Sequence, residues 1–354
     1  RVMLKHLNAH KLVHSRLLLL VIAVSVLFLT SGCGLFGTKK KIQVPQLLTP
    51  KIEAGRDRLF HEVNRFSTVT SIHGKVDIQF EDTSFATFGI ADQYRLVDGD
   101  ITLERPGKIY LIIQLLFVDI AQMSSDGQQF RVAVLKGDDK YKRFVKGTNN
   151  AVYEKLEAQP TPESKKKQPQ KKGEKETVSA LSNLRPQHLT DAFMIRPIDT
   201  SGAMFYAQSE FFQEEPDTRP NAPKGARVMR PYYVLDEFSS TQSGQAKLLR
   251  RFWFDRVSGI RLARIQFFND VGSLLTDVAY FNEKQLGSSQ TASLPSRLEI
   301  TRPQDQYKLN ITYQDVTSVE LNRTYEPKAF LLQNKWGLEE VDLDAINKKV
   351  TANK

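Results

Sequence analysis

Apolar and polar side chains alternate along much of this 354-residue chain. Three early segments show the alternation clearly: 72–80, 109–115 and 130–134. A period of two places apolar side chains on one face of a β-strand and polar ones on the other. Later segments repeat it: 203–212, 228–238, 247–254, 260–268, 274–282, 294–302 and 306–313. The sequence therefore predicts a mainly β fold, a single antiparallel sheet of about 11 strands with one apolar face.

Two other segments are predicted to be helices. Apolar residues recur on one helical face of residues 52–66, which indicates an amphipathic helix. Residues 185–195 place Leu189, Ala192 and Phe193 at helical spacing and predict a short second helix. Because the apolar face of a sheet must be covered, we expect these two helices to lie over its open side.

The strand rhythm is interrupted twice. Residues 159–177 are rich in lysine, proline and glutamine, and residues 213–226 are rich in proline. Such segments bury too little apolar surface to offset the entropy of ordering, so both are predicted to be disordered insertions. Since the same rhythm runs on either side of them, we predict one domain over residues 51–345, followed by a tail, 346–354. Turn signals include Asp98-Gly99-Asp100.

The N-terminal segment has the pattern of an export signal. Residues 1–16 are basic and contain no acidic side chain, and residues 17–29 are apolar apart from one serine. This apolar run is shorter than the roughly 20 residues of a membrane-spanning helix. Small residues then precede Cys33, the one cysteine of the chain, in a pattern that resembles the lipobox of bacterial lipoproteins. An uncleaved signal anchor over residues 17–36 is the alternative.

If the lipobox interpretation holds, residues 1–32 are a signal peptide and residues 33–50 an acylated N-terminus and flexible tether. The resemblance implies a diacylglycerol and an N-acyl chain on Cys33, which would attach the protein to a membrane. A single cysteine leaves no partner for a disulfide. The net charge of +10 is not concentrated on periodic faces, so no nucleic-acid partner is expected.

No catalytic signature is present in the sequence. We find no nucleophile elbow, phosphate-binding loop or dinucleotide fingerprint. The histidines after the leader, His61, His73 and His188, are too scattered to predict a metal site or a catalytic triad. We therefore expect a protein that is not an enzyme and that has no cofactor beyond the acyl groups on Cys33.

Several short motifs are distributed over roughly residues 52–343: Ile72-His73-Gly74-Lys75-Val76-Asp77-Ile78, Arg105-Pro106-Gly107-Lys108-Ile109, Ser124-Ser125-Asp126-Gly127, Phe252-Trp253-Phe254-Asp255, Leu321-Asn322 and Trp336-Gly337-Leu338. Together they resemble the LolA/LolB-like lipoprotein carriers and receptors of the bacterial periplasm and outer membrane. The resemblance implies an incomplete, strongly curved antiparallel barrel, closed by helices, whose cavity holds acyl chains.

The resemblance also implies roles for particular residues. Arg105 matches the arginine that fastens the helical lid to the barrel rim in the family, and a rim residue that pairs with Glu104 or a neighbouring carboxylate is the alternative. The predicted cavity lining is the apolar face of the early strands: Ile72, Val76, Ile78, Phe80, Ile109, Leu111, Ile113, Phe130 and Val132. We interpret Leu115-Leu116-Phe117 as continuous buried strand, although it could form the protruding apolar loop of the receptor.

These features favour a membrane-anchored bacterial lipoprotein that binds the acyl chains of lipoproteins or other lipids, for transport to or insertion into the outer membrane. Its expected partners are the membrane, lipidated cargo and a periplasmic carrier protein. Gly34 after the acylated cysteine favours the outer over the inner membrane by analogy. We expect the protein to lie on the periplasmic side of that membrane. The alternative is a structural or interaction lipoprotein of the envelope that fills its own barrel. The two differ in whether the inner face of the sheet is packed solid.

Overall fold

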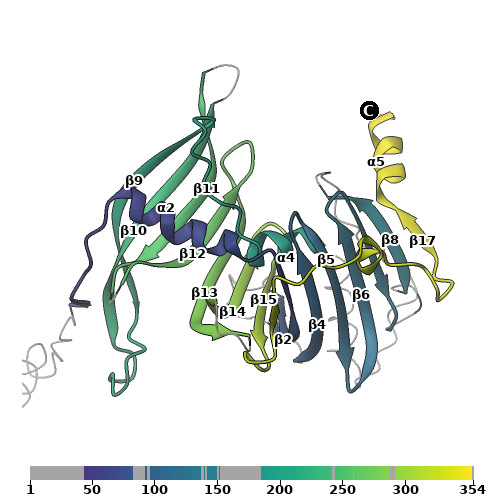
Figure 1. Ribbon diagram of the computed structural model, residues 1–354, viewed down its shortest axis with the longest axis horizontal. Coiled ribbons are helices and arrows are strands. Elements are labelled where there is room, and N and C mark those ends of the chain that lie inside the picture. Colours follow the sequence, from purple (N-terminus) through teal and green to yellow (C-terminus); the bar gives the residue numbers. More distant parts are fainter. Residues whose placement is uncertain are drawn as a thin grey trace, which may run out of the picture. The chain divides into compact units, whose positions relative to one another are not determined.

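The alternating segments form the strands of one open, curved sheet in the computed structural model (Figure 1). The structure describes residues 44–82, 92–93, 96–136, 139, 142–149, 151, 185–240, 244–257, 259–287 and 292–352. Gln46–Lys354 forms one compact unit, to which all of the following elements belong. The prediction of a mainly β fold built on a single curved sheet is confirmed.

Within the described residues, the sheet contains seventeen strands. The long strands of the C-terminal half are β9 (Met204–Pro216), β10 (Arg227–Ser240), β11 (Ala246–Asp255), β12 (Arg261–Phe268), β13 (Leu274–Leu286), β14 (Ala292–Arg302) and β15 (Tyr307–Tyr313). Those of the N-terminal half are β2 (Ser71–Asp82), β4 (Val97–Glu104), β5 (Lys108–Leu115), β6 (Val118–Asp126), β7 (Gln129–Val134) and β8 (Arg143–Thr148). Four short strands complete it: β1 (Gln46–Leu47), β3 (Asp92–Gln93), β16 (Glu320–Leu321) and β17 (Glu340–Asp342).

Strand β2 joins the two halves of the sheet. It pairs antiparallel with β15 on one side and with β4 on the other. From β9 to β15, and again from β4 to β8, each long strand pairs antiparallel with its neighbour in the sequence. The short strands β1 and β17 instead run parallel to β10 and β8. The antiparallel prediction is therefore correct for the long strands.

The helices are short. They are α2 (Arg56–Asn64), the 3-10 turn η1 (Arg65–Thr68), α4 (Pro186–Phe193), the 3-10 turn η4 (Pro327–Phe330) and α5 (Leu343–Ala352). Both predicted helices are present but shorter than predicted. The first begins four residues late because the chain before it is extended: the Ile52 amide donates to the Arg256 carbonyl at 2.9 Å.

Several predicted boundaries need correction. Residues 213–216 are not part of a disordered insertion, because they complete β9 and pair with residues 227–230 of β10. Residues 46–47 of the predicted tether form β1, and residues 346–352 of the predicted tail belong to α5. The predicted insertion at 159–177 lies outside the described residues.

Asp98-Gly99-Asp100 is not a turn but the beginning of β4, where Gly99 pairs with Val76 of β2. A Cβ atom on Gly99 would lie 2.8 Å from side-chain atoms of both Val76 and Ile78. This glycine therefore allows two apolar side chains of β2 to pack over the neighbouring strand.

The apolar side chains of the strands gather on one face, which we call the inner face. They form one large core cluster with Leu59 and Val63 of α2, Phe66 of η1, and Leu189 and Phe193 of α4. On the outer face of β5–β8, a smaller cluster forms where Leu332 and its neighbours pack on Ala133 and Phe144. Both faces of this part of the sheet are therefore covered.

Candidate functional site: a fastened cover over the inner face

Two short segments cover the inner face between the halves of the sheet: residues 56–68, which contain α2 and η1, and residues 186–198, which contain α4 and the chain that follows it. We call these two segments the cover. Figure 1 shows α2 crossing the strands of the C-terminal half and α4 near the middle of the sheet. They are distant in sequence, so side chains from the strands must hold them together.

Arg105 provides the most extensive of these connections. It follows the last residue of β4, and its guanidinium donates hydrogen bonds to four main-chain carbonyl oxygens. One of them, Phe66 (3.1 Å), belongs to the first segment of the cover, and another, Val69 (2.8 Å), directly follows that segment. The other two follow α4, Met194 (3.1 Å) and Ile195 (3.0 Å). One side chain thus ties both segments of the cover to the sheet.

The chemistry of arginine suits this position. Its planar guanidinium carries five N–H donors in a fixed arrangement, so it can satisfy several carbonyls at once. Partial burial lowers the pKa of Arg105, although an arginine remains charged at neutral pH. Its positive charge also complements the carbonyl end of α4, where the helix dipole is negative. The predicted alternative, pairing with Glu104, is not observed, since Glu104 bonds to Lys108 at 2.6 Å.

The turn that carries Arg105 is held by a second turn. Gly127 lies against Pro106 so closely that a Cβ atom on it would be 2.6 Å from the Pro106 carbonyl oxygen. The φ angle of Gly127 is +97°, which L side chains rarely adopt. The Arg-Pro and Ser-Asp-Gly motifs of the sequence therefore meet at one rim of the sheet and position the guanidinium together.

The chain after α4 is fastened from the other half of the sheet as well. Arg250 of β11 donates to the carbonyls of Arg196 (2.9 Å) and Pro197 (3.3 Å). Its guanidinium also forms a buried ion pair with Glu237 of β10, at 2.6 Å. Tyr280 of β13 donates to the carbonyl of Ala192 at 2.9 Å. Sequence reasoning identified neither connection, because a main-chain carbonyl acceptor leaves no trace in a residue pattern.

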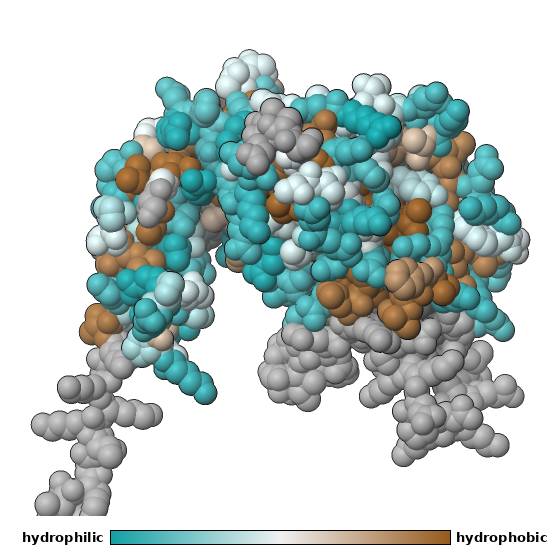
Figure 2. Space-filling model, turned by 60° about the horizontal axis from the view of Figure 1, so that its bottom comes forward, coloured by the Kyte–Doolittle hydropathy of each residue, from teal (hydrophilic) through white to brown (hydrophobic). Residues whose placement is uncertain are grey.

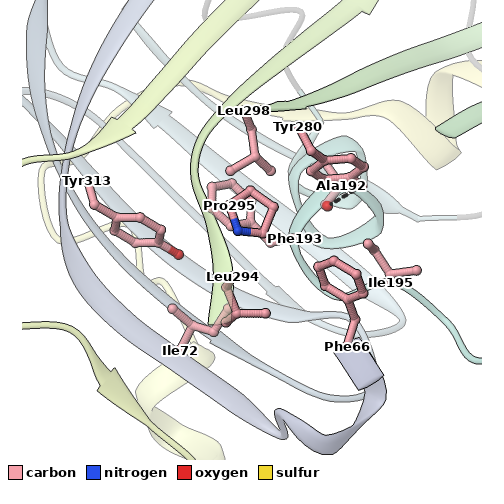
Figure 3. Close-up of a pocket in the computed structure, with 10 residues that line it drawn as sticks. All are labelled: Phe66, Ile72, Ala192, Phe193, Ile195, Tyr280, Leu294, Pro295, Leu298 and Tyr313. Carbon is pink, nitrogen blue, oxygen red and sulfur yellow. Dashed lines mark hydrogen bonds between the residues drawn. The ribbon is translucent and has the colours of Figure 1, made fainter. Parts of the chain in front are cut away.

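Beneath the cover lies a small apolar cavity, shown in Figure 3. Its walls come from the cover and from strands of both halves: Phe66, Ile72, Ala192, Phe193, Ile195, Tyr280, Leu294, Pro295, Leu298 and Tyr313. The cavity volume is about 20 Å³, whereas pockets for small ligands are typically about 300–1,000 Å³. Among the described residues, the cavity beneath the cover is therefore too small in this closed arrangement to hold an alkyl chain.

The predicted lining residues all lie on the inner face. Each of the nine is at least nine-tenths buried and belongs to the large core cluster: Ile72, Val76, Ile78, Phe80, Ile109, Leu111, Ile113, Phe130 and Val132. Of these, Ile72 alone lines the small cavity. The others contact side chains of the core, so the alternation identified the correct face but not the position of the cavity.

The segment Leu115-Leu116-Phe117 is only partly the strand that was predicted: Leu115 ends β5 and packs against the core, whereas Leu116 and Phe117 form an exposed apolar turn. Leu116 and Phe117 connect β5 to β6 and are 67% and 93% exposed. Both have positive φ angles, 49° and 66°, a conformation costly for side chains of this kind. Figure 2 shows that exposed apolar side chains gather in patches on the face it presents. We call residues 116–118 the apolar tip.

The remaining predicted site residues contribute little to this site. Cys33 lies outside the described residues. His73 contacts Thr102 at 3.0 Å, and His188 of α4 contacts the hydroxyl of Tyr307 at 2.9 Å. No cluster of three or more metal-ligating side chains occurs within the described ranges. Among the helices of those ranges, none has the length and apolar character needed to cross a membrane.

No family model matches the sequence, and no curated protein matches it either. Similar solved structures include a LolA superfamily protein from Nitrosomonas europaea (12% identity, 79% of this chain and 99% of that chain, TM-score 0.39). They also include a putative outer membrane lipoprotein-sorting protein domain from Vibrio parahaemolyticus (12%, 77% and 94%, TM-score 0.39). A third is a DUF1329 family protein from Desulfovibrio piger (10%, 80% and 98%, TM-score 0.36). The low TM-scores indicate only a loose similarity of fold.

Proposed function

We propose that this protein is a non-enzymatic carrier or acceptor of acylated molecules in the bacterial cell envelope. It would be attached through acyl groups on Cys33, on the periplasmic side, with the outer membrane favoured over the inner. The observation that supports this proposal most strongly is the fastening of two distant helical segments by Arg105 over an apolar sheet face. Hydrogen bonds at a rim can be exchanged for water when the cover moves outward.

The energies involved are compatible with such a movement. Loss of the four carbonyl bonds of Arg105 would cost about 3 kcal/mol, since each is a partly solvated bond from a charged donor. Burial of a 16-carbon acyl chain releases about 13 kcal/mol at about 0.8 kcal/mol per CH₂ group. The cost of opening the cover is therefore small beside the free energy that keeps an acyl chain out of water.

The apolar tip provides a route from the membrane. A turn with Leu116 and Phe117 exposed costs free energy in water and would gain it in the apolar part of a bilayer. Two positive φ angles at apolar residues are a local strain that a plain hairpin would avoid with glycine or asparagine. We therefore assign the tip to contact with the lipid surface at which cargo is received or released.

Photo-crosslinking tests the carrier function. The full-length protein, in membranes that contain a phospholipid with a photoreactive group on its acyl chain, is irradiated, and the modified peptides are identified by mass spectrometry. We expect adducts on the strands beneath the cover, β13 and β14, in addition to adducts on the apolar tip. Parallel labelling with radioactive palmitate, with Cys33→Ser as the control, tests the anchor.

The second candidate is a structural or interaction lipoprotein of the envelope whose inner face is permanently filled. The small volume of the cavity, about 20 Å³, favours this function. The same experiment separates the two candidates, because a filled scaffold would give adducts at the tip or none at all. Absence of adducts on β13 and β14, even when Arg105 is replaced by leucine, would decide for the scaffold.

A further inference from the structure

A second cavity, larger and polar, lies next to the first segment of the cover. Its volume is about 250 Å³, and its charged walls are Arg58 and Glu62 of α2, Arg65 of η1, Arg261 of β12 and Glu283 of β13. Ser293 of β14 completes the polar wall. Three arginines and two glutamates leave one net positive charge in the cavity.

The two carboxylates of this cavity already accept hydrogen bonds from groups of the cavity wall. Both oxygens of Glu62 bond to Arg65, at 2.8 and 2.9 Å, and one also accepts from the amide of Leu262 at 2.9 Å. Glu283 accepts from Arg261 and from the hydroxyl of Ser293, each at 2.7 Å. Burial opposes ionisation of Glu283, but the bonds from Ser293 and Arg261 lower its pKa. Both carboxylates are therefore already neutralised by bonds within the wall.

Arginine N–H groups in the cavity, in contrast, remain available as hydrogen-bond donors to a ligand. Within the described residues, the guanidinium of Arg58 forms no hydrogen bond or ion pair, and Arg261 uses a single N–H group, its Nη1, in its bond to Glu283. Both side chains are exposed at the cavity mouth. Free guanidinium groups around a polar cavity match a phosphate, which accepts two parallel hydrogen bonds from each arginine.

The polar cavity shares a wall with the small apolar cavity. Arg65 lines the first, and the next residue, Phe66, lines the second. Across from them, Ser293 lines the polar cavity, and Leu294 lines the apolar one. The Arg65 guanidinium donates to the Ser293 carbonyl and so closes this wall. Figure 3 shows Phe66 and Leu294 on the apolar side.

From this arrangement we infer that the cargo is an amphiphile with a phosphate ester headgroup, bound by Arg58 and Arg261 while its acyl chains enter beneath the cover at Phe66 and Leu294. The inference rests on the proposed carrier function, to which it adds the headgroup. It also gives Arg65 a role as a positioning residue: its bond to Ser293 must break for a single molecule to occupy both cavities.

Two photoreactive lipids with identical acyl chains test the headgroup. Full-length protein in neutral detergent micelles is crosslinked with photoreactive phosphatidic acid or with the matching diacylglycerol. We expect phosphatidic acid to bind at least about tenfold more tightly. Replacement of both cavity arginines, Arg58→Gln with Arg261→Gln, should remove the preference and leave diacylglycerol binding unchanged. Arg56→Gln, on the same helix but outside the cavity, should keep the preference, and thermal unfolding verifies that each variant is folded.

A preference that survives the double substitution overturns the inference. If neither lipid modifies the wild-type protein, the carrier function fails, and the cavity is then judged by calorimetric titration with inorganic phosphate and glycerol 3-phosphate. Binding of these by the wild type but not by the double variant supports the arginines as an anion site for a free phosphate ester. Absence of binding overturns the anion site as well. Binding of phosphate without any preference for phosphatidic acid overturns the headgroup assignment.

Discussion

Replacement of Arg105 by leucine should loosen the cover without unfolding the sheet. The substitution removes four hydrogen bonds to carbonyls that water can partly satisfy once the cover moves. We expect the closed arrangement to lose about 3 kcal/mol, which corresponds to local opening about a hundredfold more often. Hydrogen exchange measured by mass spectrometry on peptides from residues 186–198 reports this opening directly.

Two controls make the interpretation specific. Arg105→Lys keeps the charge, but one ammonium group cannot reach the carbonyls of both cover segments, so it should restore only part of the protection. Arg264→Leu removes an arginine of β12 whose guanidinium bonds to Asp277 of the neighbouring strand β13 rather than to the cover, and it should leave exchange at 186–198 unchanged. Exchange in Arg105→Leu equal to that of the wild type would refute the fastening role. Cooperative unfolding of the whole domain would instead assign Arg105 a purely structural role.

Three further substitutions test other contacts. Tyr280→Phe removes a buried hydroxyl bond to α4 and should lower the free energy of unfolding by about 1 kcal/mol, measured in urea. Removal from water, and then the charges of nearby arginines, hold the pKa of His188 well below 6.5. Below pH 6.5 the unfolded chain therefore binds a proton at His188 that the folded one does not. The free energy of unfolding should decrease as the pH is lowered, by up to about 1.4 kcal/mol per pH unit. In His188→Asn this contribution to the pH dependence of stability should vanish. An unchanged pH dependence would contradict its assignment to His188. Phe117→Ser should weaken binding to phospholipid vesicles about tenfold or more without loss of stability, whereas Val271→Ser, at an 83% exposed turn elsewhere, should not.

The alternation of side chains predicted those strands well in which one face is buried and the other is less buried. In β15, for example, every second residue from Tyr307 to Tyr313 is buried. It did not predict β4, where Gly99 occupies an inward position and the neighbouring aspartates suggested a turn. Local residue patterns could not distinguish a strand glycine that makes room for β2 from a turn glycine.

The candidate site was predicted only in part. Arg105 was selected from a short motif, but its four acceptors are main-chain carbonyls, which depend on how distant segments pack. The apolar tip was interpreted wrongly because Leu116 and Phe117 continue an apolar run, and a run alone does not reveal a change of backbone direction at positive φ. The polar cavity beside Arg58 was missed altogether, since its charged residues are drawn from four separate elements.

The pairing of β2 with β15 has a consequence for biosynthesis. Val76 pairs with Tyr313, roughly 230 residues later, so the central seam of the sheet forms only after nearly the whole chain is available. Until then the backbone groups along one side of β2 have no neighbour and can attract other chains. Fragments that end before residue 307 should therefore aggregate, and newly made molecules should need protection until their last long strand is available.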